Sequence, residues 1–450
     1  MGHFLIQSRA ALICIVLLVA TIVLGGGGTV NPGTEIALEL VAVVCVLAWL
    51  VTVRGRTAPA SVWILVGLVF IVPVLQLVPL PPFLWQALPG REMTRAALDL
   101  VGLADSWRPV SLVPAATLSS LLALGPPLAL LWMVSQLDLR ERQAVLLAIA
   151  VTVFAGGLLG AAQVVGGRGF YLYDYSHFEW LTGFQANRNA EADVLVIGLL
   201  AFTAAQAARG QARAVRAAIA AVGVGFLALA TVLTGSRTGI AILAVMLLPV
   251  VFAHLRLLRV GNRRIAATFA AGILTLPAAV WLALRVPSLT RAVERFDGQR
   301  DFRLELWTDG WSAALAYWPI GGGVGGFVQL FLPFERLEVL DETSPNRAHN
   351  DYLEWLIEAG LPGIAVLLAV AIVVAVMILQ AWKRYRAAGG KDREVSALTL
   401  LFSCGTLTTI AAHSILDYPL RSMAIAGLLA VAAGLLTRPT GTVPMEGSRP

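Results

Sequence analysis

A short run of polar residues stands where a loop enters a long apolar segment. It contains Arg347, His349, Asn350, Asp351 and Tyr352. An imidazole is the side chain best poised near neutral pH to take a proton from a hydroxyl group. The three residues after the histidine offer it hydrogen-bond partners. His349 is therefore a candidate general base, the alternative being a histidine that caps a helix or binds a lipid headgroup; Arg347 receives no role.

Two arginines lie at the edges of other apolar segments. In the sequence Asn187-Arg188-Asn189, Asn189 is a plausible helix N-cap, so Arg188 would lie at the positive end of a helix, which suits a bound anion. The alternative is an arginine that snorkels to headgroups. Arg237 lies between two apolar segments with hardly any loop around it. A charge there needs a partner, and a phosphate fits the planar guanidinium fork.

Acidic residues and cysteines give no sign of a metal site. Glu191 and Asp193 form the nearest acidic pair, but they stand at the entrance to an apolar segment. Cys14, Cys45 and Cys404 all lie inside apolar segments, so they predict neither a disulfide framework nor a metal centre. We expect neither a metal nor another cofactor.

Composition shows what must position these residues. Of 450 residues, 58% are hydrophobic and 13% are charged, which does not describe a soluble globule. A helix that crosses a bilayer needs about 20 mostly apolar residues. We therefore predict a single all-α membrane domain over residues 1–450, a polytopic bundle of about twelve transmembrane helices. The predicted spans are 9–27, 35–53, 61–80, 117–135, 143–165, 193–208, 215–234, 238–255, 265–284, 350–381, 396–415 and 421–437.

Positive charge in short loops predicts the orientation, because such loops stay in the cytoplasm. The opposite short loops, 25–34, 235–237 and 416–420, carry only Arg237. Both termini are then cytoplasmic, and the basic composition needs no nucleic-acid partner. The arginines and lysines of the alternate loops are Arg54, Arg56, Arg140, Arg142, Arg209, Arg213, Arg216, Arg256, Arg259, Arg263, Arg264, Lys383, Arg384, Arg386, Lys391 and Arg393.

Three loops on the other side are long enough to hold chemistry: 81–116, 166–192 and 285–349. The first is rich in proline and tryptophan and predicts an interfacial cap, although its arginines could meet an anion. The long loop 285–349 predicts an interfacial helix over 303–318, whose apolar residues recur at three- and four-residue steps, followed by a tight turn in the glycine run 321–326.

These motifs resemble the O-antigen ligase and polymerase superfamily. The resemblance covers about residues 180–365 and lies in these motifs, in order: Asn187-Arg188-Asn189, Ser236-Arg237-Thr238-Gly239, Arg303 with Leu306-Trp307, Pro319-Ile320-Gly321-Gly322-Gly323, Ala348-His349-Asn350-Asp351-Tyr352-Leu353-Glu354, and Glu358-Ala359-Gly360-Leu361-Pro362-Gly363.

The resemblance implies a metal-independent glycosyltransferase on the periplasmic face of the bacterial inner membrane. Such enzymes take a glycan from an undecaprenyl-diphosphate carrier and transfer it to a hydroxyl of the lipid A core or of a lipid-linked glycan. Carried onto this chain, the resemblance gives Arg188, Arg237 and Arg303 as ligands of the diphosphate. His349 becomes the general base or the group that orients the acceptor.

Three hypotheses remain open from the sequence. A ligase would transfer a finished glycan to another acceptor, and a polymerase would join lipid-linked repeat units. These two share donor, topology and motifs, and only the acceptor distinguishes them. A transporter or flippase would move the lipid-linked glycan; it would usually carry ionisable residues near mid-membrane and two related halves, and the sequence shows few such charges.

Overall fold

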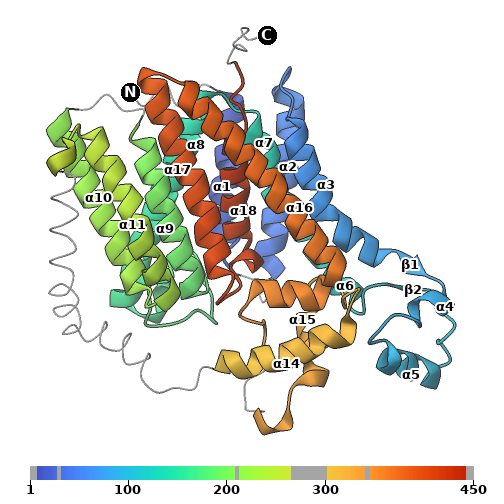
Figure 1. Cartoon of the computed structure of the whole chain (residues 1–450). Helices are drawn as coiled ribbons and strands as arrows, with labels where there is room; N and C mark the ends of the chain where they lie inside the picture. Colours follow the sequence, from blue (N-terminus) through green and yellow to red (C-terminus); the bar gives the residue numbers. More distant parts are fainter. Residues whose placement is uncertain (1–7, 28–31, 208–211, 265–301, 340–344, 442–450) are drawn as a thin grey trace.

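The computed structural model describes residues 8–27, 32–207, 212–264, 302–339 and 345–441 (Figure 1). Within these ranges, eight helical segments are long and apolar enough to cross a membrane. This confirms an all-α polytopic membrane protein. The predicted span 265–284 lies outside the described residues, so the total of twelve stays a prediction. The eight segments are α2 (Pro32–Thr52), α3 (Ala60–Leu77), α6 (Pro114–Ala123) with α7 (Gly125–Ser135), α8 (Leu139–Gly166), α10 (Arg213–Leu233), α11 (Arg237–Leu257), α16 (Asp351–Ala387) and α17 (Gly390–His413).

Among the described residues, three further helices belong to the bundle. The shorter apolar helices are α1 (Arg9–Leu24) and α18 (Met423–Leu435). Helix α9 (Arg188–Ala205) lies at the centre, packed against α8, α10, α11 and α17, and almost every side chain from Glu191 onward is buried. A helix that is buried all round needs no polar face, so it can form the core of the bundle.

Helices α14 (Phe302–Tyr317) and α15 (Phe327–Phe331) lie across one end of the bundle, which we call the α14 end (Figure 1). The predicted helix 303–318 is therefore present. Leu304 and Trp311 on it are exposed, whereas Leu306 and Ala313 are buried in the packing of α14 with neighbours that include α16. The helix thus has two apolar faces, one toward the protein and one outward, where a membrane interface would meet it.

The opposite end brings together both ends of the described chain. Ser8 hydrogen-bonds Glu141, and the Thr440 amide donates to the Leu137 carbonyl at 3.3 Å. Arg142 is buried there and donates to the carbonyls of Leu435 and Thr437 at 3.0 and 2.8 Å, so it holds the end of α18 in place. Which side of a membrane this end faces stays a prediction.

Helix α16 is broken at Gly360, which has φ 55°. Pro362 causes the break, because it has no N–H to offer the Glu358 carbonyl four residues earlier. That carbonyl instead accepts from the Gly323 amide at 2.9 Å and from Gln76 Nε2 at 2.8 Å. The predicted turn in the glycine run therefore supplies the hydrogen bonds that a break in a membrane helix requires.

The predicted cap 81–116 folds as short elements beside the end of α3 (Figure 1). Its Arg91 is buried and donates to the carbonyls of Pro89, Val110 and Gly321 at 2.6–3.0 Å, so it holds the cap on the glycine run and is not placed to meet an anion. Its elements are α4 (Pro82–Trp85), α5 (Glu92–Leu100) and the strand β2 (Arg108–Pro109), which pairs antiparallel with β1 (Pro79–Leu80) just before the cap. The remaining 3-10 turns are η3 (Arg168–Phe170), η4 (Leu332–Phe334), η5 (Leu337–Val339) and η6 (Pro419–Arg421).

Candidate active site

His349 is held at the α14 end immediately before α16. Its backbone has φ 48°, and its Nδ1 lies 3.0 Å from Asp417 Oδ1. Its ring meets Tyr418 edge to face at 4.9 Å between centroids. The side chain is 21% exposed, so it is fixed by the protein yet still reached from outside. These contacts come from the loop between α17 and α18, whose proximity to His349 was not predicted from the sequence.

The three residues that follow His349 have other partners. Asn350 is the N-cap of α16 and accepts from the Leu353 amide at 3.0 Å. Asp351 accepts from Ser414 Oγ at 2.9 Å, and the Tyr352 hydroxyl donates to a backbone carbonyl. These residues were expected to be hydrogen-bond partners of His349, but in the structure its Nδ1 forms a hydrogen bond with Asp417. Helix capping directs the first residues of α16 toward their own backbone and the neighbouring loop.

Asp417 links His349 to the interior of the bundle. Its second oxygen, Oδ2, accepts from Asn189 Nδ2 at 2.6 Å and lies 4.0 Å from His413 Nε2. Burial alone would raise the pKa of Asp417, but the hydrogen bonds and charges of these partners outweigh burial and lower the pKa. Asp417 is thus an anion at neutral pH. His413 in turn bonds Asp193 at 2.7 Å between Nδ1 and Oδ1.

The predicted acidic pair is split by the fold. Asp193 faces His413, whereas the Glu191 carboxyl is buried against Gly183. The two carboxyl groups therefore have different surroundings. Among the residues that the structure describes, no group of three or more His, Cys, Asp or Glu side chains is arranged to hold a metal ion.

Arg188 and the turn just before Arg237 pack against the same tryptophan. The Arg188 guanidinium lies over the Trp180 ring at 4.8 Å from its centroid, and that ring packs against Gly235, which has φ 63°. A side chain on Gly235 would collide with Trp180, so the glycine permits this packing. Ser236 caps α11, and Arg237 is its exposed first residue. The N-cap of α9 is Asn187, not Asn189 as predicted, which makes Arg188 the first residue of that helix.

Arg303, at the start of α14, lies close enough to His413 for their charges to interact. We call Arg188, Arg237 and Arg303 the arginine group. The structure places all three at the α14 end with His349, as the sequence motifs suggested, on α9, α11 and α14. Their role as diphosphate ligands stays a prediction.

Two other arginines are embedded among carboxylates. Arg347 bonds Glu354 at 2.9 Å, and Arg421 bonds Glu354 at 3.1 Å and Glu358 at 2.6 Å. Arg421 also lies 4.0 Å from Asp351. We call these five residues the carboxylate cluster. Burial alone would lower the pKa of Arg421, but the surrounding carboxylates outweigh it and raise the pKa.

The carboxylate cluster also fixes the backbone around His349 and Asp417. Glu354 accepts from the Ala348 amide at 3.0 Å, while Trp307 Nε1 donates to the Ala348 carbonyl at 2.9 Å. The Asp351 amide donates to the carbonyls of Ser414 and Asp417 at 2.9 and 3.2 Å. The first turns of α16 therefore hold the histidine loop and the aspartate loop in one arrangement.

The part of the site that lies in 413–421 was not predicted from the sequence. Loop length and charge predicted 416–420 as a short loop and Arg421 as the first residue of an apolar span. A signal was present, because Asp417, Tyr418 and Arg421 stand together at a span boundary, as the residues around His349 do. Only the length and the positive charge of this loop were used, and these predict the orientation of the helices in the membrane, not the chemistry of the loop.

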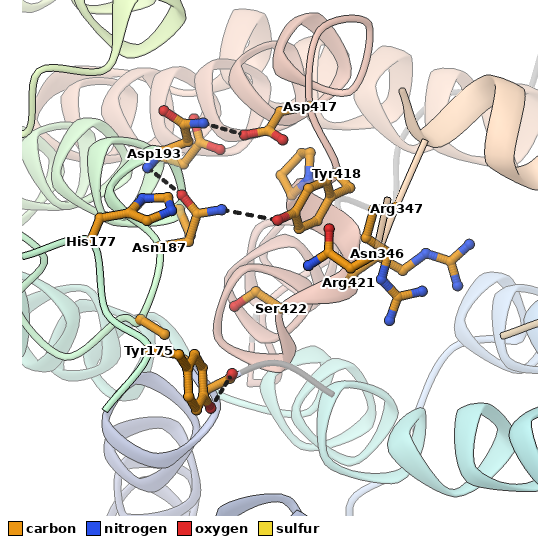
Figure 2. A pocket seen from close by; sticks show the side chains of 16 residues that line it. Tyr175, His177, Asn187, Asp193, Asn346, Arg347, Asp417, Tyr418, Arg421 and Ser422 are labelled. Atoms are coloured by element: carbon orange, nitrogen blue, oxygen red, sulfur yellow. Dashed lines mark hydrogen bonds between the residues drawn. The ribbon is translucent and has the colours of Figure 1, made fainter. Parts of the chain in front are cut away.

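A cavity of about 140 Å³ opens beside these groups (Figure 2). Asp417, Tyr418, Arg347 and Arg421 reach its wall, with residues from the start of α9 and from the segment before it. Burial raises the pKa of Tyr418 to about 12, so this side chain is a neutral phenol at neutral pH. The cavity thus lies on the Asp417 and Tyr418 side of His349.

One comparison with known proteins gives a match to a family over about a third of the chain. Residues 222–368 match the family described as O-antigen ligase. This stretch of the chain is similar to an O-antigen ligase domain. Arg237, Arg303 and His349 fall within the matched residues of this domain, while Arg188 and Asp417 lie outside them.

The other comparisons add little to the O-antigen ligase assignment. No curated protein matches the chain. One chain of a solved structure, titled "Structural coordination of polymerization and crosslinking by a peptidoglycan synthase complex", is 20% identical. The alignment covers 83% of this chain and 95% of that one, with a TM-score of 0.41. Similarity at this level implies nothing about substrates.

Proposed function

We propose that this protein transfers a glycan from an undecaprenyl-diphosphate carrier to an acceptor hydroxyl on the periplasmic face of the inner membrane. The observation that supports this function most directly is the His349–Asp417 pair, at the same end of the bundle as the arginine group. A base for the acceptor and cations for the leaving group are the two requirements of the reaction. The similarity to an O-antigen ligase domain agrees with this chemistry.

In the proposed mechanism, His349 acts on the acceptor. Its Nδ1–H donates to ionised Asp417, which leaves the lone pair on Nε2 to take the acceptor proton. The acceptor oxygen forms a bond to the anomeric carbon as its O–H bond breaks. Asp417 holds the ring in position and stabilises the imidazolium that forms.

The arginine group acts on the donor. The bond between the anomeric carbon and the diphosphate oxygen breaks with its electron pair, so negative charge grows on the departing diphosphate. Guanidinium groups fixed at that position stabilise the transition state more than the ground state. Arg188 and Arg237 begin two neighbouring helices, where backbone N–H groups also favour an anion.

The decisive test replaces His349 with alanine. We expect His349→Ala to abolish glycan transfer in cells that lack the wild-type protein, at unchanged amounts of protein in the membrane. His254→Ala is the matched control, because His254 is a buried histidine of α11 that contacts Thr203 and takes no part in the site. Transfer by His349→Ala at the wild-type rate would remove the catalytic assignment.

A deletion strain distinguishes the forms of this function. Full-length polymer left on the carrier indicates a ligase, and single repeat units on the carrier indicate a polymerase. Normal chains trapped on the cytoplasmic face would instead indicate the alternative, a transporter or flippase of the lipid-linked glycan.

A further inference from the structure

The cavity beside Asp417 has a polar wall built from distant parts of the chain. Tyr175 and Asn187 come from the segment around the start of α9, Asn346 precedes His349, and Tyr418 and Ser422 lie between α17 and α18 (Figure 2). Pockets for drug-sized ligands measure about 300–1,000 Å³. At about 140 Å³, this cavity encloses one small group.

The charges around the cavity decide what kind of group that is. Arg347 and Arg421 reach the wall, but both bond to carboxylates of the carboxylate cluster. Carboxylates therefore already neutralise both guanidinium groups of the wall. The carboxyl groups of Asp193 and Asp417 also line the wall. A phosphate or another anion would meet the carboxyl groups of Asp193 and Asp417 at short range, where opposite charge is needed to bind it.

A second observation calls for a hydrogen-bond donor. Asp193 lines the cavity and is 1% exposed, and its Oδ2 has no hydrogen-bond partner among the described residues. A buried carboxylate oxygen is acceptor-only and is costly to leave without a donor. A hydroxyl group supplies that donor, whereas an ionised phosphate does not.

The rest of the wall suits a ring with several hydroxyl groups. The amides of Asn187 and Asn346 and the hydroxyl of Ser422 offer both donors and acceptors, and the rings of Tyr175 and Tyr418 offer apolar surface. We propose that the cavity binds one uncharged sugar ring of the acceptor, separate from the arginine group that meets the diphosphate. This assignment of the acceptor rests on the proposed function. The acceptor is then a neutral saccharide at the position next to the reacting hydroxyl.

Binding of simple probes tests the proposal without turnover. Saturation-transfer NMR on the purified full chain, with methyl glucosides and methyl galactosides at millimolar concentration, should give clear signals. Methyl glucuronide should bind at least tenfold more weakly, because its carboxylate meets the carboxyl groups of the wall. Inorganic diphosphate should not displace the neutral glycosides.

Two variants locate the site. Asn346 is exposed, so Asn346→Trp can fold while filling the cavity, and it should reduce the glycoside signal at least fivefold. Leu337→Trp, at an exposed residue of η5, is the matched control and should leave the signal unchanged. Tyr175→Ala is a second variant that removes one wall and should also weaken the signal.

The outcomes separate this proposal from the proposed function. No glycoside signal in the wild type, an unchanged signal in both Asn346→Trp and Tyr175→Ala, equal binding of the glucuronide, or displacement by diphosphate would each overturn the sugar site. His349→Ala should keep the glycoside signal while losing transfer. If His349→Ala still transfers glycan, the proposed function fails, and the binding result stands by itself.

Discussion

Arginine has two different structural settings within the α14 end. In the carboxylate cluster, Arg347 and Arg421 are surrounded by buried carboxylates and hold α16 to its loops. In the arginine group, Arg188 lies over a tryptophan ring and Arg237 is an exposed first residue of a helix. The same side chain can therefore fix the scaffold in one region and be placed to meet a substrate in the other. The groups that surround the guanidinium determine which of these two roles it has. Its distance from His349 does not.

The largest effect is expected from a substitution that disrupts the carboxylate cluster. Glu354→Gln keeps the size of the side chain but leaves Arg347 and Arg421 without the carboxylate between them. Removing one partner from a buried ion pair costs about 3–5 kcal/mol, so we expect a large fall in thermal stability and in membrane yield. Glu394→Gln, an exposed residue of α17, is the control. Wild-type melting behaviour of Glu354→Gln would show that the cluster does not stabilise the site.

Next in size is the loss of Asp417. Asp417→Asn removes the anion that orients His349, and we expect glycan transfer to fall on the order of 100-fold, within the range for general acid–base catalysis. The amount of protein in the membrane should change much less than with Glu354→Gln. Transfer at more than half of the wild-type rate would argue that Asp417 only supports the fold.

A smaller effect is expected from a substitution in the arginine group. Arg237→Lys keeps the charge but loses the planar fork, so we expect transfer to fall about tenfold with unchanged thermal stability. Arg264→Lys, near the opposite end of α11, should leave transfer unchanged. If Arg237→Lys instead lowers stability and spares transfer, Arg237 belongs with the structural arginines, and the contrast between the two regions disappears.

The smallest expected effect is a pH dependence of stability. The pKa of Asp417 is lowered in the folded protein, so the stabilisation that it provides is fully present above its unfolded pKa of about 3.9 and is lost as the pH falls through the folded value. Melting temperatures of the purified protein between pH 3 and 7 should therefore fall more at the acid end for the wild type than for Asp417→Asn. Parallel curves would contradict the lowered pKa.

Much of the fold was predictable because a bilayer imposes simple rules on sequence. Long apolar segments had to be helices, and α16 and α8 appear where apolar length placed them. The first residue of α9 was harder to predict, because Asn187 and Asn189 are both good helix N-caps. Only the structure shows that the Asn187 side chain accepts a hydrogen bond from the Asn189 amide. Helix existence followed from hydrophobicity, whereas helix ends depended on individual hydrogen bonds.

The site was less predictable, because its key contacts join residues far apart in the sequence. His349, Arg188 and Arg237 could be identified from the sequence because they lie at the boundaries of predicted spans. Asp417, the partner of His349, could not be paired with it, because that contact depends on how α17 packs against both α16 and α18. Local patterns identify residues that are suited to chemistry, and the packing of helices decides which of them meet.

The break at Gly360 divides α16 into two parts with different surroundings. The residues before it include the buried Asp351, Glu354 and Glu358 of the site. In the most apolar stretch of the helix only 6% of the residues are buried, so this stretch faces outward, where lipid would surround it. Bilayers differ in thickness, and lipid-facing helices respond by tilting. Because the glycine run and Gln76 anchor the chain just before the break, we expect such tilting to stop there. The protein would then work at a constant geometry in membranes of different lipid composition.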